Sequence, residues 1–144
     1  MSNRPIKTLL VEDNDSYCRL VAKMLGGAGD NSFEIEYVDT LAKGIEALGD
    51  DGIDLVLLDL QLPDSEGLGT FTELHERYPD IPIIVLTGMS DEDLAVKAVQ
   101  LGAQDYLIKS EVDVKQLKRS IKYALERQRD INNRKSIEKA LFEE

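Results

Sequence analysis

Short apolar runs alternate along the chain with longer segments whose apolar positions recur with a helical period. The apolar runs predict five strands, at residues 6–12, 33–39, 53–59, 81–87 and 105–109. Three of them are nearly unbroken runs of Val, Ile and Leu, which is typical of parallel strands covered on both faces. The run at 33–39 alternates apolar with acidic side chains, which indicates an edge strand with one polar face.

The segments between the strands predict five helices, at residues 14–26, 40–49, 66–77, 90–101 and 111–129. Residue types that favour helix N-caps precede or begin four of them: Asp15 or Ser16, Thr40, Ser65 and Ser90. Glycines stand where helices should end: Gly26–Gly27, Gly49 and Gly102. Strands that alternate with helices through short linkers predict an α/β fold, a doubly wound five-stranded parallel sheet of the (βα)₅ type.

The last predicted helix continues beyond residue 127 as a mostly polar segment. Apolar residues on this helix could form a seam, but Gln128, Lys135 and Glu138 interrupt it. We therefore expect a globular domain over residues 1–127 and an extended C-terminal helix over 128–144. That extension could run into solvent, or it could serve as a helical linker or a dimer seam.

Composition narrows the class of protein. The chain has 144 residues, of which 42% are hydrophobic and 31% charged, as expected for a soluble globular domain. Its net charge of -11 argues against direct binding to nucleic acid or to an anionic membrane surface. A single cysteine, Cys18, fits a reducing compartment, and no signal peptide or membrane span is evident. These features predict a cytoplasmic protein.

Polar side chains stand at or just after the carboxyl ends of four predicted strands. They are Glu12 and Asp13, Asp59, Thr87 and Lys109. Each has an ordinary structural explanation by itself, as a helix cap, a strand residue or a solvated strand end. Ligands of open parallel sheets bind beyond the carboxyl ends of the strands, however, so a group of such residues at that edge indicates a site.

The combination has a chemical rationale. An ionised carboxylate such as Asp59 at the end of an apolar run is costly without a cation, and three neighbouring carboxylates repel one another. Mg²⁺ prefers carboxylate oxygens, carbonyls and water. A phosphoryl group at Asp59 would meet the metal on one side and Lys109 on the other, and Thr87 could donate a hydrogen bond to it. Asp59 is therefore best interpreted as a nucleophile for phosphoryl transfer.

Four motifs together resemble the response-regulator receiver domains of two-component signalling, over roughly residues 5–127. They are "LLVEDND", "VLLDLQLPDSEG", "IIVLTG" and "GAQDYLIKS", in the family's order and at its spacing. The resemblance implies the family's flavodoxin-like fold. It also implies a phosphoacceptor signalling domain, one that is not an enzyme acting on other substrates.

The resemblance implies a role for each site residue. Asp59 would accept a phosphoryl group from a histidine kinase or histidine phosphotransfer protein. Asp13, Asp59 and the backbone carbonyl of Gln61 would ligate Mg²⁺, with Glu12 assisting through a water molecule. Lys109 would pair with the phosphoryl oxygens.

The resemblance also implies a switch. Thr87 would move toward the phosphoryl group, Tyr106 would turn inward, and the small Gly88 would keep the group accessible. The readout surface would comprise the fourth helix, the fifth strand and the fifth helix. It would control a downstream effector domain or protein, and a phosphorylation-dependent homodimer is a further possible outcome.

The chain departs from the family at several positions. Ser110 stands where proline, often with a cis bond, is usual. A cis Lys109–Ser110 bond would cost about 2.5–4 kcal/mol, so we expect a trans bond. The Lys109 side chain would then point in a somewhat different direction from the lysine of family members with a cis proline. Ser65 replaces a commonly apolar residue. Gln61 and Met89 occupy positions that tune dephosphorylation in the family, which leaves the lifetime of the phosphate open.

Three other interpretations stay open. The pair Asp13 and Asp15 after an apolar strand is similar to the haloacid-dehalogenase phosphatases, with Asp13 as nucleophile, but Tyr17 is unusual there and Asp59 would be unexplained. A flavodoxin-like binding module would need a phosphate loop where this chain has the acidic "EDND". A degenerate receiver would only bind a partner. The single histidine, His75, is expected to be a solvated helix residue, so a phosphodonor histidine would come from another protein.

Overall fold

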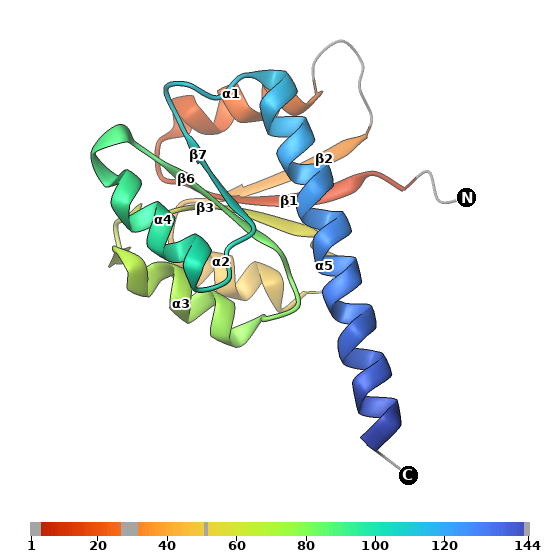
Figure 1. Ribbon diagram of the computed structural model, residues 1–144. Helices are drawn as coiled ribbons and strands as arrows, with labels where there is room; N and C mark the ends of the chain where they lie inside the picture. Colours follow the sequence, from red (N-terminus) through yellow and green to blue (C-terminus); the bar gives the residue numbers. More distant parts are fainter. Residues whose placement is uncertain (1–3, 27–31, 51, 143–144) are drawn as a thin grey trace.

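The computed structural model describes residues 4–26, 32–50 and 52–142 (Figure 1). Five parallel strands form one sheet in the order β2-β1-β3-β6-β7. Their bounds are β1 (Ile6–Val11), β2 (Phe33–Val38), β3 (Leu55–Asp59), β6 (Ile83–Thr87) and β7 (Asp105–Ile108). The predicted sheet is confirmed, and so is the edge position of β2. Two short antiparallel strands, β4 (Gln61–Leu62) and β5 (Ser65–Glu66), follow β3 and lie outside this sheet.

Helices cover both faces of the sheet, as the doubly wound fold requires (Figure 1). They are α1 (Asp15–Gly26), α2 (Leu41–Leu48), α3 (Leu68–Arg77), α4 (Glu92–Gln100) and α5 (Val114–Phe142), with a short 3₁₀ turn, η2 (Met89–Asp91), before α4. Successive strand residues point to opposite faces. Val56 and Leu58 accordingly join a core with α2, α3 and α4, while Leu55 and Leu57 join a second core with α1 and α5.

The helix starts differ from the sequence prediction at three of four positions. Thr40 does cap α2, since its side chain accepts a hydrogen bond from the Lys43 backbone N–H. Before α1, however, Asn14 accepts the Tyr17 N–H at 3.0 Å, in place of Asp15 or Ser16. Ser65 lies in β5 and bonds Thr70 at 2.7 Å. The helix α3 starts after Gly67, and α4 starts after Asp91, because Ser90 lies inside the turn η2.

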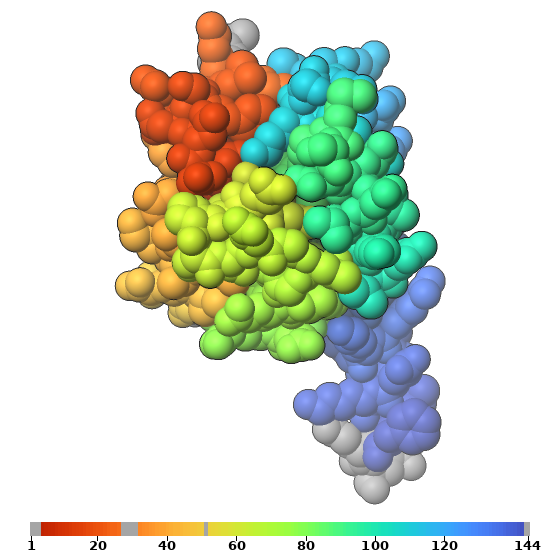
Figure 2. All heavy atoms as spheres, turned by 90° about the vertical axis from the view of Figure 1, so that its left-hand side faces the viewer, coloured from red at the N-terminus to blue at the C-terminus, as the bar shows by residue number. Residues whose placement is uncertain are grey.

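The structure confirms the extended C-terminal helix, which continues without interruption to Phe142. Gln128, a polar residue in the predicted apolar seam, has a buried side chain that accepts a hydrogen bond from Gln104 at 2.9 Å. Lys135 lies further along and pairs with Asp80 at 3.1 Å. The lower part of α5 projects from the body of the domain (Figure 2). The boundary expected at residue 127 stays a prediction, although α5 contacts the domain beyond that point.

His75 is not the solvated residue that the sequence predicted. Its ring is half-buried and stacks on Phe71, with 5.1 Å between ring centroids and 17° between ring planes. It also lies against Gly102, which follows α4 and has a φ of 127°. The neighbouring charges in the sequence gave no sign of this packing.

Substitution Gly102→Ala is expected to destabilise the fold by about 2 kcal/mol. The positive φ is strained for an L side chain, and the added Cβ would lie 2.7 Å from His75 Nε2. Chemical denaturation with and without the substitution measures the effect. Gly69→Ala is the matched control, because a Cβ there meets nothing within 4 Å and the residue lies in α3. We expect that variant to gain about 0.5–1 kcal/mol, and an unchanged Gly102→Ala stability would contradict the account.

Candidate phosphoryl-transfer site

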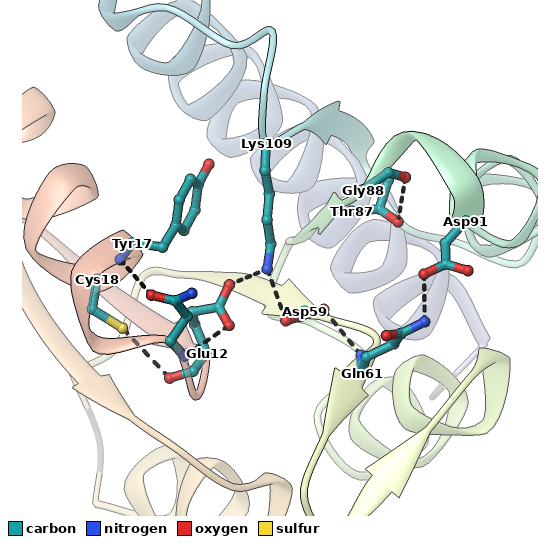
Figure 3. Close-up of polar contacts among 10 residues, drawn as sticks. Glu12, Tyr17, Cys18, Asp59, Gln61, Thr87, Gly88, Asp91 and Lys109 are labelled. Carbon is teal, nitrogen blue, oxygen red and sulfur yellow. Dashed lines mark hydrogen bonds and ion pairs between the residues drawn. The ribbon is translucent and has the colours of Figure 1, made fainter.

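Strand register brings four of the predicted site residues to one edge of the sheet. Val11 pairs with Leu58, so Glu12 is level with Asp59. Along the next two strands, Asp59 pairs with Leu86 and Thr87 with Ile108. Thr87 therefore lies one residue beyond the level of Asp59, and Lys109 lies one residue beyond the level of Thr87. Four adjacent strands thus deliver their polar ends to the same edge, as the sequence predicted (Figure 3).

Lys109 lies between two carboxylates. Its Nζ donates to Asp59 Oδ2 at 2.9 Å and also to Glu12 Oε1. Backbone amides hold the other carboxylate oxygens: the Gln61 N–H donates to Asp59 Oδ1 at 3.0 Å, and the Asn14 N–H donates to Glu12 Oε2 at 3.1 Å. All four carboxylate oxygens therefore accept a hydrogen bond, and two of these bonds come from the same ammonium.

Burial has the largest single effect on the pKa values of both Glu12 and Lys109. The Glu12 side chain is only 1% exposed. Burial raises its pKa from 4.5 to about 7, against the lowering influence of Lys109, and the neighbouring Asp59 adds to the rise. Burial alone would lower the pKa of Lys109, but its bonds to Glu12 and Asp59 outweigh that effect and raise it. The ammonium consequently stays charged at neutral pH, while burial makes Glu12 easier to protonate than an ordinary glutamate.

Three carboxylates form a cluster that suits a hard divalent cation. Oxygens of Glu12, Asp13 and Asp59 all lie within 4.8 Å of one another, and Asp13 is exposed while the other two are buried. Carboxylate oxygens are the donors that Mg²⁺ prefers. The donor set therefore fits the predicted ion, and the exposed Asp13 leaves a side open to solvent. The role of the Gln61 carbonyl stays a prediction.

The hydroxyls of the two predicted switch residues donate hydrogen bonds to groups other than Asp59. Thr87 is buried at the end of β6, and its hydroxyl donates to the Gly88 carbonyl at 3.3 Å. The Tyr106 hydroxyl donates instead to Glu92 Oε2 of α4 at 2.8 Å. That bond to Glu92 and partial burial raise the pKa of Tyr106. In this structure Tyr106 is thus held by α4.

Two site features were missed from the sequence. The Tyr17 ring lies under the Lys109 ammonium, 5.1 Å from Nζ to the ring centroid. The Gln61 side chain donates to Asp91 Oδ2, so it bridges the turns after β3 and β6. Neither pair is close in sequence. The Lys109–Ser110 peptide bond is trans, as expected, and Lys109 still reaches Asp59.

The fold and this cluster of side chains define a receiver domain of two-component signalling. A family model described as "Response regulator receiver domain" matches residues 8–122. The chain belongs to that family. Receiver domains of this family serve generally in signalling rather than as catalysts.

Curated relatives are longer proteins that include such a domain. The chain is 31% identical over 125 residues to the transcriptional regulatory protein ZraR of Escherichia coli K12, which covers 87% of this chain and 27% of that protein. It is 39% identical over 100 residues to the regulatory protein LuxO of Vibrio cholerae, covering 69% and 21% respectively. The chain thus spans about a quarter of the length of the curated relatives it matches.

Solved structures agree on the fold. The signal receiver domain of an HD domain-containing protein from Pseudomonas fluorescens Pf-5 superposes with a TM-score of 0.79 at 26% identity, covering 93% of this chain and 96% of that one. The receiver domain of a LuxO repressor protein from Vibrio parahaemolyticus gives 0.76 at 29% identity, with coverages of 89% and 95%. Over residues 4–26, 32–50 and 52–142, no helix has the length and apolar character needed to span a bilayer.

Proposed function

We propose that the domain is a phosphorylation-dependent switch in which Asp59 accepts a phosphoryl group from a histidine kinase or histidine phosphotransfer protein. The observation that carries the proposal is the position of Lys109, which bonds Asp59 and Glu12 at the edge of an acidic cluster. A cluster of this kind provides a nucleophile, a fixed positive charge and donors for a divalent cation. Phosphoryl transfer depends on those three elements.

The chain's own residues have distinct parts in the transfer. One Asp59 carboxylate oxygen attacks phosphorus, the P–N bond of the donor phosphohistidine breaks, and the imidazole leaves with that electron pair. The Gln61 N–H fixes the orientation of the carboxylate through Oδ1. The ammonium of Lys109 attracts the phosphoryl oxygens as negative charge gathers at Asp59.

A divalent cation completes the proposed site. Mg²⁺ would be held by Asp13, Asp59 and the Gln61 carbonyl, with Glu12 assisting through water, and it would neutralise charge on the phosphoryl oxygens. Glu12 also retains Lys109 close to Asp59. These assignments rest on the family resemblance together with the clustered oxygens of Glu12, Asp13 and Asp59.

Signal output is proposed to follow from rearrangement of Thr87 and Tyr106. Thr87 would turn from the Gly88 carbonyl to the phosphoryl group, and Tyr106 would leave Glu92 and turn inward. The surface formed by α4, β7 and α5 would change with them. On β7, Asp105 accepts a hydrogen bond from Ser120 of α5 at 2.8 Å, which gives a direct link between that strand and the long helix.

The proposed setting is the cytoplasm, with a kinase or phosphotransfer protein upstream and an effector domain or protein downstream. The relatives named above are transcriptional or other regulatory proteins that extend well beyond the matched region. A phosphorylation-dependent homodimer is a further proposal. A sedimentation series with and without beryllofluoride would detect it.

Treatment with acetyl phosphate and Mg²⁺ tests the proposal. We expect a mass increase of one phosphoryl group on the intact chain, mapped to Asp59, and little or none when EDTA replaces Mg²⁺. Label on Asp13 would support the haloacid-dehalogenase interpretation. No label under conditions that phosphorylate another receiver domain would favour a degenerate module that only binds a partner.

A further inference from the structure

Tyr17, in the first turn of α1, lies against the site without a role in the transfer described above. Its ring centroid is 5.1 Å from Lys109 Nζ, within the range of a cation–π interaction. The phenol oxygen is buried, and none of the described residues forms a hydrogen bond with it. Figure 3 shows the ring beside the Lys109 side chain, with the hydroxyl directed away from the carboxylates. The ring face, rather than the hydroxyl, is therefore what Tyr17 presents to the ammonium.

Lys109 has two other partners, and both belong to the acidic cluster. Glu12 and Asp59 accept its hydrogen bonds and also supply oxygens to the group that fits a divalent cation. A carboxylate oxygen that binds such a cation has less negative charge to offer an ammonium. The face of an aromatic ring does not compete for the metal in this way, so its attraction for Lys109 remains.

The phenol is also suited to remain neutral. Burial, followed by smaller contributions from Glu12 and Asp59, raises the pKa of Tyr17 to about 12 despite the opposing effect of Lys109. Tyr17 therefore adds no further negative charge beside three carboxylates at any pH near neutrality. Packing supplies an ordinary explanation for the residue, since its side chain contacts the apolar core beneath α1 and α5. Leucine could pack against that core too, but it could not attract an ammonium.

We propose that Tyr17 is a positioning residue for Lys109. Its ring holds the ammonium at the site while Glu12 and Asp59 are engaged by a divalent cation, so that Lys109 meets a phosphoryl group bound at Asp59. This inference rests on the proposed function. It adds a side chain on α1 to the determinants of phosphoryl binding.

The test uses two substitutions that separate the ring from the hydroxyl. Tyr17→Phe keeps the ring, and Tyr17→Leu keeps apolar volume without it. Beryllofluoride is the probe of phosphoryl binding, followed by ¹⁹F NMR of the whole chain in saturating Mg²⁺. We expect Tyr17→Leu to weaken beryllofluoride binding by about 3- to 10-fold, and Tyr17→Phe to match the wild type. Tyr123→Leu, an exposed tyrosine on α5, is the control and should have no effect.

Two further readouts separate this role from simple packing. Mg²⁺ affinity without beryllofluoride should be the same in all variants, since Tyr17 offers the metal no ligand. The Lys109 side-chain ε protons should show an upfield ring-current shift in the wild type and Tyr17→Phe, lost in Tyr17→Leu. This second measurement does not depend on phosphoryl chemistry.

The outcomes are distinct. Equal beryllofluoride affinity in wild type and Tyr17→Leu, with the wild type binding well, would overturn the role of Tyr17 alone. Equal weakening in Tyr17→Phe and Tyr17→Leu would also overturn it, because the hydroxyl would then be responsible. Absence of beryllofluoride binding in the wild type would overturn the proposed function and this inference with it.

Discussion

Substitution Asp59→Asn is expected to reduce phosphoryl incorporation from acetyl phosphate by at least about 100-fold. The neutral amide is a poor nucleophile, and it cannot form the acyl phosphate that an Asp59 carboxylate would form. The substitution preserves shape, and the amide oxygen can still accept a hydrogen bond from the Gln61 N–H. The loss should therefore be chemical rather than structural. Intact-mass spectrometry over a time course with Mg²⁺ measures the rate.

Asp15→Asn provides the matched control for that experiment. Asp15 is an exposed carboxylate close to the site in sequence, and it pairs with Arg19 on the same helix at 3.1 Å. Because it lies outside the cluster of carboxylates, its substitution should leave the rate within about twofold. Incorporation by Asp59→Asn at the wild-type rate would rule out Asp59 as acceptor. A large loss in Asp15→Asn alone would instead favour the phosphatase interpretation with Asp13 as nucleophile.

The second large effect is a pH dependence of stability in the metal-free protein. The pKa of Glu12 is about 7 in the folded chain against its ordinary 4.5. A raised folded-state pKa favours the protonated form, so its stabilisation is fully present below pH 4.5 and is lost as pH rises through 7. Because of Glu12, we expect the free energy of unfolding to fall by about 3 kcal/mol between pH 4.5 and about pH 8.

Denaturation in EDTA across this pH range, on wild type and Glu12→Gln, measures the contribution of Glu12. Because Gln cannot titrate, the stability of the variant relative to wild type should increase steadily as pH rises. Glu126→Gln, on the exposed face of α5, is the control and should follow the wild type. A constant difference between Glu12→Gln and wild type from about pH 4.5 to about pH 8 would show that Glu12 has no raised pKa.

The sequence predicted the sheet and its site for related reasons. Runs of Val, Ile and Leu mark buried parallel strands, and the alternation in β2 marks an edge. Once the strands are parallel, their carboxyl ends must share one side of the sheet. Glu12, Asp59, Thr87 and Lys109 could consequently be brought together without any knowledge of their distances. Strand and helix bounds were less accurate, since local pattern does not fix where pairing stops.

Features that depend on tertiary contact could not be predicted in the same way. His75 stands among charged residues in the sequence, yet it stacks on Phe71 because α3 packs beside the turn after α4. In the sequence, Gln128 interrupts an apolar seam. In the structure its side chain is buried, and it accepts a hydrogen bond from Gln104, which is far away in sequence. Ser65 is a residue type that favours helix N-caps, but in the structure it lies in the short strand β5, opposite Leu62 of β4.

The site shows the same limit. Tyr17 belongs to the helix after β1, and Lys109 follows β7 at the other end of the chain. Their contact depends on how α1 packs near the carboxyl end of the sheet, which no local periodicity encodes. The hydrogen bond from Tyr106 to Glu92 likewise depends on a side-chain rotamer. Motif spacing identifies which residues reach the site, while their mutual orientation requires the packed structure.

A crystal structure of the chain with Mg²⁺ and beryllofluoride is the most direct test of the central claim that Asp59 is the phosphoacceptor at a cation site. The account predicts beryllium bound to an Asp59 carboxylate oxygen, the metal ligated by Asp13 and Asp59, and Lys109 Nζ in contact with fluoride. Beryllofluoride attached to Asp13, or metal bound away from the oxygens of Glu12, Asp13 and Asp59, would contradict it.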